Sequence, residues 1–200
     1  MMRLEATGLG KHFSRHWVFR NLHISLQEGE RVSLCGENGS GKSTLMRILS
    51  GQLTPSEGSV RLLADGKPID PEEYYRHLSW SGPYMELYTD LDLREAIRLH
   101  ASFRPMMATP REVAQLLELE EHHGKLLKHF SSGMLHRVKV GLAILTRSRV
   151  LLLDEATTNM DAGNSALVLG LLDRFLDGRL LVYASNKAEE FAMFDRRVVL

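Results

Sequence analysis

The sequence predicts an α/β fold, in which strands and helices alternate and a helical segment is inserted in the middle of the chain. Residues 150–153 form a continuous apolar run, which is typical of a strand buried on both faces of a sheet. Residues 31–35 form a second apolar, β-prone run, and helical spacing follows it at 44–49. Between about 83 and 147 the strand patterns stop and only helical patterns occur.

Before this insert, apolar alternation and turn residues define the elements. Alternation predicts strands at 2–9, 22–26 and 59–63, and turn residues occupy 28–30 and 55–58. Asp70-Pro71 opens a short predicted helix that runs to residue 77, because proline suits the first helical position.

The insert and the last part of the chain continue the pattern. Helical periodicity predicts three helices in the insert, at 93–101, 110–119 and 133–146. After the apolar run at 150–153, the same patterns predict helices at 161–176 and 187–194 and strands at 179–184 and 197–200.

Composition narrows the class of protein. Two hundred residues suit one domain, and 44% hydrophobic with 25% charged residues is ordinary for a globular protein. Lys plus Arg and Asp plus Glu both number 25, so net charge gives no reason to expect nucleic acid or an anionic membrane as a partner. The single cysteine, Cys35, excludes an internal disulfide and favours a reducing, cytoplasmic setting. No apolar run approaches a membrane span, so a role at a membrane would require a partner.

A glycine-rich loop follows the predicted strand at 31–35. Its sequence is Gly36-Glu37-Asn38-Gly39-Ser40-Gly41-Lys42-Ser43, and Thr44 follows. Glycines let backbone N–H groups turn inward onto phosphates, and the helix after the loop adds the positive end of its dipole. Lys42 would supply a charge at the β and γ phosphates, and the Ser43 hydroxyl can ligate Mg²⁺. The spacing therefore predicts a nucleotide phosphate-binding loop.

Two acidic residues, Asp154 and Glu155, end the apolar run at 150–153. Ligands of open α/β sheets bind at the carboxyl ends of the strands. We expect Asp154 to hold the Mg²⁺ that Ser43 also contacts, and Glu155 to polarise an attacking water as a general base.

A third motif, Phe130-Ser131-Ser132-Gly133-Met134, precedes the predicted helix at 133–146. Ser131 is a candidate N-cap, and Gly133 would let backbone N–H groups approach an anion closely. In this position the motif resembles the signature sequence of ABC ATPases, usually Leu-Ser-Gly-Gly-Gln. The loop, the signature and the acidic strand end occur in the order of that family, and the resemblance covers essentially the whole chain. His136, on the same helix, is expected to face solvent.

The resemblance implies a fold and a mechanism. It implies a P-loop NTPase core of the ABC type at about 1–82 and 148–200, with an antiparallel sub-sheet, and a helical sub-domain at about 83–147. Two such domains pack head to tail, as a homodimer or heterodimer, with ATP between the loop of one and the signature of the other. Ser131 and Gly133 would then contact the nucleotide held by the partner's loop. Phe13 falls where the family has an aromatic residue that stacks on adenine.

The chain departs from the family pattern in three places. The signature has Ser132 and Met134 where the family has glycine and glutamine. Asn186 stands in place of the switch histidine, and it can hydrogen-bond the γ-phosphate but carries no positive charge. Pro83 stands at the glutamine of the Q-loop and offers no side-chain ligand. Because Glu155 is retained, we expect slow ATP hydrolysis.

Three functions compete. The first is the ATPase subunit of a transporter, on the cytoplasmic face of a membrane through a membrane-spanning subunit. The compact chain resembles the haem-exporter (cytochrome c maturation) type, so export is expected, and the substrate would be chosen by the membrane subunit. The second is a non-transport ABC ATPase acting as a regulatory or binding module, but such proteins usually carry two loops or long coiled coils, and this chain has neither. The third, a small-molecule P-loop kinase, is disfavoured by the signature-like motif and the acid pair.

Overall fold

The computed structural model describes residues 1–186 and 194–200. The chain divides into two compact units. The core unit comprises Met1–Trp80, Ser148–Glu155 and Gly178–Leu200, and the helical unit comprises Ser81–Arg147 and Ala156–Asp177. The helical unit therefore contains a stretch after the acidic strand end as well as the inserted segment.

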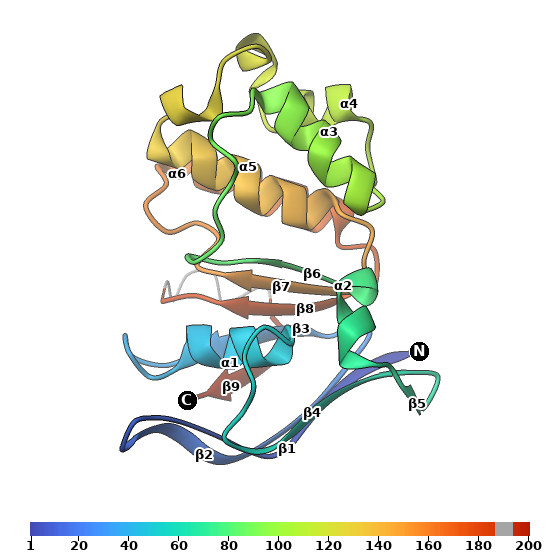
Figure 1. Ribbon diagram of the computed structural model, residues 1–200, viewed down its shortest axis with the longest axis vertical. Helices are drawn as coiled ribbons and strands as arrows, with labels where there is room; N and C mark the ends of the chain where they lie inside the picture. Colours follow the sequence, from blue (N-terminus) through green and yellow to red (C-terminus); the bar gives the residue numbers. More distant parts are fainter. Residues whose placement is uncertain (187–193) are drawn as a thin grey trace. The chain divides into compact units, whose positions relative to one another are not determined.

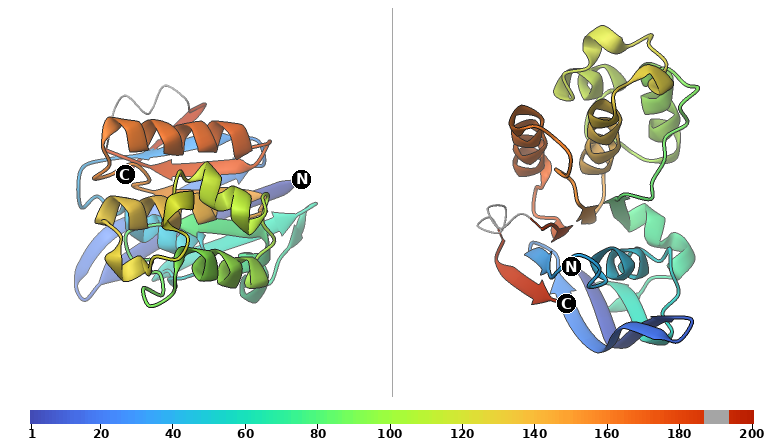
Figure 2. Two further views of the ribbon diagram at one scale, coloured as in Figure 1. Left: turned by 90° about the horizontal axis from the view of Figure 1, so that it is seen from above. Right: turned by 90° about the vertical axis from the view of Figure 1, so that its left-hand side faces the viewer.

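Two sheets form the core unit, and Figures 1 and 2 show them from three directions. An antiparallel sheet has the order β2-β1-β4-β5, with β1 Met2–Phe13, β2 His16–Gln27, β4 Glu57–Ala64 and β5 Lys67–Pro68. A second sheet has the order β6-β7-β8-β3-β9, with β6 Leu78–Ser81, β7 Val150–Asp154, β8 Leu180–Ala184, β3 Arg31–Cys35 and β9 Arg196–Val199. In the second sheet β7 pairs with β8, and β3 with both β8 and β9, in parallel.

Helix α1 (Lys42–Leu49) lies between the two sheets of the core unit (Figure 1). Its apolar residues are buried, and it contacts β7 and β8. A short 3-10 helix, η1 (Pro71–Glu73), and α2 (Tyr74–His77) follow β5; Asp70 caps η1 by accepting a hydrogen bond from the Glu72 N–H. The buried Tyr74 hydroxyl accepts a hydrogen bond of 2.9 Å from the backbone N–H of Leu62, which fixes this segment to β4.

The helical unit consists of α3 (Leu93–Phe103), α4 (Pro110–Leu116), α5 (Ser132–Leu145) and α6 (Ala162–Phe175), with 3-10 turns η2 (Glu120–His122) and η3 (Leu127–His129). A polar side chain caps each helix: Asp92 and Thr109 form full capping boxes, and Ser131 and Asp161 cap α5 and α6. Helix α5 contacts both α4 and α6, and the right-hand view of Figure 2 shows α5 and α6 side by side.

The sequence predicts most of these elements. The five residues of β7 are all buried, as their continuous apolar run requires, and α3, α5 and α6 begin within a residue of the predicted starts. Helix α4 ends earlier than predicted, and Glu118 just beyond it has a left-handed backbone (φ 50°). The hairpin of β1 and β2 is longer than predicted because bulged pairing continues through polar residues. Strand β6 is not predicted, and the helix expected at 187–194 falls largely on residues 187–193, outside the described part.

Within residues 1–186 and 194–200, none of the helices combines the length and the apolar character that crossing a bilayer requires.

Candidate active site

The glycine-rich loop begins directly after β3 and ends where α1 begins. Gly41 is the N-cap of α1 and has a left-handed backbone, with φ 103°. A Cβ on this residue would collide with a side-chain methyl of Val18 on β2, so both conformation and space require glycine. No side chain caps the first turn of α1, so its N–H groups, including those of Ser43 and Thr44, face the loop without an intrahelical partner.

Lys42 folds back across the loop that precedes it. Its ammonium donates hydrogen bonds of 2.8 Å to the Gly36 carbonyl and 2.9 Å to the Glu37 carbonyl, and the residue is only 6% exposed. The Ser40 hydroxyl is buried in the same loop and has no hydrogen-bond partner. A buried cation, a helix N-terminus and an unpaired hydroxyl therefore meet in one loop, an arrangement that suits a phosphate group.

Asp154 ends β7 in the same unit and is 1% exposed. Neither of its carboxylate oxygens has a hydrogen-bond partner of ordinary geometry. Burial raises the pKa of Asp154 to about 6, opposed by the nearby Ser43 hydroxyl and the Lys42 charge, while the charge of Glu155 raises it further. A buried carboxylate without partners is costly unless a cation balances it.

These residues fit a magnesium ion. Magnesium prefers a few protein oxygens together with phosphate oxygens, and Asp154 with Ser43 supplies such a set. Among the described residues there is no group of three or more His, Cys, Asp or Glu side chains that could hold a metal by themselves. A metal at this position would therefore need the phosphate oxygens of a nucleotide.

Glu155 follows Asp154 and has a left-handed backbone, with φ 55°. Its N–H donates a hydrogen bond of 2.8 Å to the carbonyl of Ala184 at the end of β8. The sheet thus fixes the backbone at the point where Glu155 leaves it.

Asn186, two residues after β8, lies beside the phosphate loop. Its side-chain N–H donates a hydrogen bond of 2.6 Å to the side-chain oxygen of Asn38. The structure therefore brings the residue in the switch position to the loop across 148 residues of sequence. Lys187, the last residue of the expected switch segment, lies outside the described residues.

The signature-like motif forms the start of α5 in the helical unit. The Ser131 side chain accepts a hydrogen bond of 3.2 Å from the Met134 N–H and caps the helix, as the sequence predicts. A Cβ at Gly133 would have no atom within 4 Å, so the space above this glycine is open. Ser131 is exposed, and the start of the helix is open to an approaching anion.

Phe13 ends β1 and is 49% exposed, and the Lys11 ammonium lies 5.1 Å from the centre of its ring. The ring is therefore available for stacking on a base. A second aromatic residue of the hairpin, Trp17, is also exposed and carries the Arg20 guanidinium 4.5 Å from its ring centre. Trp17 is not among the site residues predicted from the sequence, although it lies close to Phe13 along the chain.

The structure corrects the expected solvent-facing position of His136. Its Nε2 lies 3.0 Å from the backbone oxygen of Ala156, the residue after Glu155. Pro83, in contrast, is exposed as expected of a loop residue and has no side-chain donor or acceptor.

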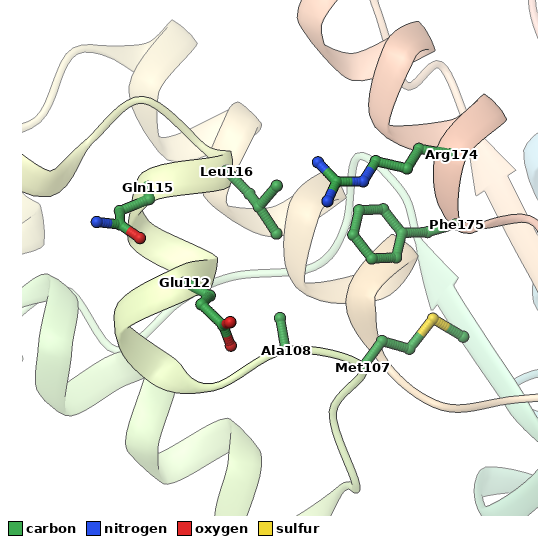
Figure 3. Close-up of a pocket in the computed structure, with 7 residues that line it drawn as sticks. All are labelled: Met107, Ala108, Glu112, Gln115, Leu116, Arg174 and Phe175. Atoms are coloured by element: carbon green, nitrogen blue, oxygen red, sulfur yellow. The ribbon is translucent and has the colours of Figure 1, made fainter.

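A hollow of about 380 Å³ also lies in the helical unit, between α4 and the end of α6 (Figure 3). Figure 3 shows Arg174 and Phe175 directed toward Leu116, with Glu112 and Ala108 nearby. None of the site residues predicted from the sequence lines this hollow.

A family model described as ABC transporter matches residues 19–158, which is more than half of the chain. The chain belongs to this family. It is an ABC transporter ATP-binding domain, and the segments matched include the phosphate loop, the signature-like motif and the acidic strand end.

The ABC domain has relatives of several kinds. It is 28% identical over 200 residues to ATP-binding cassette sub-family A member 7 of Rattus norvegicus, covering 96% of this chain and 9% of that protein. It is 29% identical over 201 residues to the ATP-dependent lipid A-core flippase of Alkalilimnicola ehrlichii, covering 94% of this chain and 34% of that protein. It is 29% identical over 206 residues to the spermidine/putrescine import ATP-binding protein PotA of Bacillus thuringiensis, covering 98% of this chain and 62% of that protein. The chain thus spans less than two thirds of each of these relatives.

Solved ABC structures share the fold. The ATP-binding cassette MJ0796, in a dimeric post-hydrolysis state bound to ADP and Pi, superposes with a TM-score of 0.84 at 22% identity, over 98% of this chain and 94% of that one. This likeness, together with the two sheets described above, confirms the predicted α/β fold of the ABC ATPase type.

Proposed function

We propose that this domain binds Mg·ATP in its phosphate loop, hydrolyses it slowly, and thereby drives a membrane-spanning transporter subunit. The observation that carries the proposal is Asp154, whose buried carboxylate has no hydrogen-bond partner of ordinary geometry and lies close to Ser43 and Lys42. A fold that only used the loop as a turn would have no reason to keep an uncompensated carboxylate there.

Each residue of the core site has a chemical role in this proposal. The loop from Gly36 to Thr44 cradles the phosphates with its N–H groups, and Lys42 exchanges its two carbonyl partners for phosphate oxygens. Ser43 and Asp154 hold Mg²⁺, which would neutralise charge on the phosphates. Glu155 orients and polarises the attacking water, and Asn186 donates a hydrogen bond to the γ-phosphate. The replacement of a histidine by Asn186 is the reason that we expect slow turnover.

The signature residues serve a second nucleotide. Ser131 and Gly133 start a capped helix with open space in front of it, which supports contact with a phosphate held by another ATPase domain. In this arrangement two domains, either two copies or two different chains, close around ATP and separate after hydrolysis. Phe13 stacks on the adenine.

An exposed apolar surface in the helical unit supports the proposed contact with a membrane-spanning subunit. Tyr88, Leu99 and Phe103 line a hollow of about 610 Å³, and Tyr88 and Phe103 are each about three-quarters exposed, at 76% and 74%. Such a contiguous patch is typical of an interaction site. We place the domain at the cytoplasmic face of a membrane through this contact. More specifically, we propose that the domain drives export, as an ATPase subunit of the compact haem-exporter type.

The first test is ATP hydrolysis by the purified protein at high concentration, with the Glu155→Gln variant as the control. Phosphate release above the variant's level, and dependent on Mg²⁺, supports the proposal. Lys42→Ala should lower ATP binding itself, whereas Glu155→Gln should leave binding intact. Equal phosphate release by wild type and Glu155→Gln contradicts the hydrolytic part of the proposal.

A further inference from the structure

Lys11 lies against the aromatic ring that is proposed to stack on adenine, and both residues belong to the core unit. They are two residues apart on β1, so their side chains project from the same face of the sheet. The Lys11 ammonium lies over the Phe13 ring, 5.1 Å from its centre. At this separation a cation is attracted by the negative charge of the ring face. One face of the ring is therefore covered, while Phe13 as a whole stays 49% exposed.

A second contact holds the ammonium in place. Lys11 Nζ donates a hydrogen bond of 2.9 Å to the backbone carbonyl of Thr54, in the segment between α1 and β4. A lysine side chain on a protein surface ordinarily samples many rotamers. Here the hydrogen bond and the ring contact together select the rotamer that places the charge against Phe13.

The pair faces the side of the antiparallel sheet on which the phosphate loop lies. Lys11 is paired with Phe19 of β2, and directly opposite residues of an antiparallel pair share a face of the sheet. A Cβ added to Gly41 of the phosphate loop would lie 3.2 Å from the Phe19 ring, so this ring reaches the loop. A nucleotide whose phosphates occupy the loop therefore has its base on the side of the sheet that carries Phe13.

We propose that Lys11 is a positioning residue for Phe13 and thereby strengthens binding of the adenine base. The proposal rests on the nucleotide binding and the Phe13 stacking proposed above, and it assigns to Lys11 no contact with nucleotide. A stacking ring binds more tightly when it is already oriented, because binding then costs less rotamer freedom. Lys11 covers one face of the ring and leaves the other for adenine, so that cation, ring and base form three layers.

The test compares a ligand that has a base with one that lacks it. Mg·ADP contains adenine, whereas magnesium pyrophosphate occupies only the phosphate loop, and neither is a substrate of the proposed reaction. Isothermal titration calorimetry measures Kd for both. Lys11→Met keeps an unbranched side chain and removes the charge, so it should weaken Mg·ADP binding by about three- to fivefold and change pyrophosphate binding by less than about twofold. Lys11→Arg keeps a cation with N–H donors and should recover most of the affinity for Mg·ADP.

Two further exchanges complete the comparison. Lys67→Met is the same substitution at an exposed position of β5 in the same sheet, and it should match wild type with both ligands. Phe13→Ala removes the ring and should weaken Mg·ADP binding by about tenfold, as expected for the loss of an aromatic ring from a stacked base. Adding Lys11→Met to Phe13→Ala should then have no further effect, because the lysine acts only through the ring.

The outcomes separate this proposal from the function on which it rests. Wild-type protein that binds neither Mg·ADP nor pyrophosphate overturns nucleotide binding itself. Binding of both ligands, with an unchanged Kd for Mg·ADP in Phe13→Ala, overturns the stacking on Phe13 and the role of Lys11 with it. A loss of Mg·ADP affinity in Phe13→Ala but none in Lys11→Met overturns only the role of Lys11.

Three results with Lys11 variants would show that the lysine does not act through the ring. Equal weakening of both ligands in Lys11→Met overturns the proposal, because the charge would then act on the phosphates or on the fold. A further loss when Lys11→Met is added to Phe13→Ala overturns it, because the lysine would then act on the nucleotide directly. Failure of Lys11→Arg to recover affinity overturns it as well, because the effect would then not come from the positive charge.

Discussion

The side chain of Asn186 donates a 2.6 Å hydrogen bond to the side chain of Asn38. This bond joins the segment after β8 to the phosphate loop, and it occupies the amide group that we propose for the γ-phosphate. A γ-phosphate that accepts a hydrogen bond from this amide would therefore have to displace Asn38.

Asn186→His should raise the rate of ATP hydrolysis several-fold. Imidazole can carry a positive charge toward the γ-phosphate, which the amide cannot. Both asparagines are on the surface, so loss of their hydrogen bond should change the free energy of unfolding by no more than about 1 kcal/mol. Steady-state phosphate release measures the effect. Asn38→Ala breaks the same bond without adding an imidazole, and an equal acceleration in that variant would show that release of Asn186, not charge, is responsible.

Glu155→Gln should accumulate as an ATP-bound dimer if two identical chains form the two sites. Removing the general base stops hydrolysis, so the ATP that holds the domains together remains. Light scattering after size-exclusion chromatography, with and without Mg·ATP, reports the mass. Ser131→Arg should abolish the shift, since a large side chain at the helix start blocks the phosphate. A variant that binds ATP yet stays monomeric would point to a different chain as the obligatory partner.

Asp154→Asn should stabilise the nucleotide-free protein while it weakens Mg²⁺-dependent ATP binding. Burial raises the pKa of Asp154 from 3.8 to about 6. The folded state therefore binds more protons than the unfolded state between pH 4 and 6, and this group's contribution to stability is present at low pH and is lost as the pH rises. Above pH 6 the variant should be more stable than wild type by roughly 2–3 kcal/mol. Denaturant unfolding of both proteins across this range measures the difference, and a constant difference across pH would refute the assignment.

His100 should contribute a pH dependence of the opposite sign. Burial, and to a lesser degree the charge of Arg104, lowers the pKa of His100 from 6.5 to about 4. The unfolded state binds more protons over this interval, so the stability that neutral His100 provides is present above pH 6.5 and is lost as the pH falls toward 4. Wild type should lose roughly 2–3 kcal/mol more than His100→Gln on acidification, as measured by urea unfolding. Its Nε2 lies 2.8 Å from the Thr146 hydroxyl, a contact that glutamine can also make.

Two glycine-to-alanine exchanges should have opposite effects on stability. Gly58 of β4 has φ 75°, and a Cβ there would collide with the backbone oxygens of Thr7 and Gly8. Gly58→Ala should therefore cost at least about 2 kcal/mol. Gly170 lies in α6 with no atom within 4 Å of an added Cβ, so Gly170→Ala should stabilise by about 0.5–1 kcal/mol. Thermal unfolding compares the stability of the two variants with that of wild type. A Gly170→Ala variant less stable than wild type would contradict the open space around a Cβ at this position.

Local patterns were enough to predict the elements that carry the site. The run that forms β7 contains only apolar residues before Asp154, and Ser131 caps its helix through a residue three positions away. Such features depend on neighbours in the sequence. The extended hairpin from β1 to β2 was harder to predict, because cross-strand pairing with bulges holds polar residues that show no alternation.

The side-chain contacts of the site could not be predicted, because they join distant parts of the chain. The place of Asn186 in the family pattern predicts a contact with the phosphate, but nothing in the sequence indicates its bond to Asn38. His136 has ordinary helical spacing, and only the fold brings it to Ala156. The raised pKa of Asp154 could not be predicted either, because it results from burial of the strand end in the folded chain.

The position of β3 in the sheet has a consequence for synthesis of the chain. β3 carries the phosphate loop, and its two neighbours, β8 and β9, come from residues 180–184 and 196–199. A ribosome adding 5–20 residues per second needs roughly 10–30 s to proceed from β3 to β9. For most of that interval Val32 and Leu34, which are fully buried in the folded domain, lack both strands that flank β3 in the sheet. The pairing that fixes β3 on both sides can therefore be completed only after residue 199 has left the ribosomal tunnel.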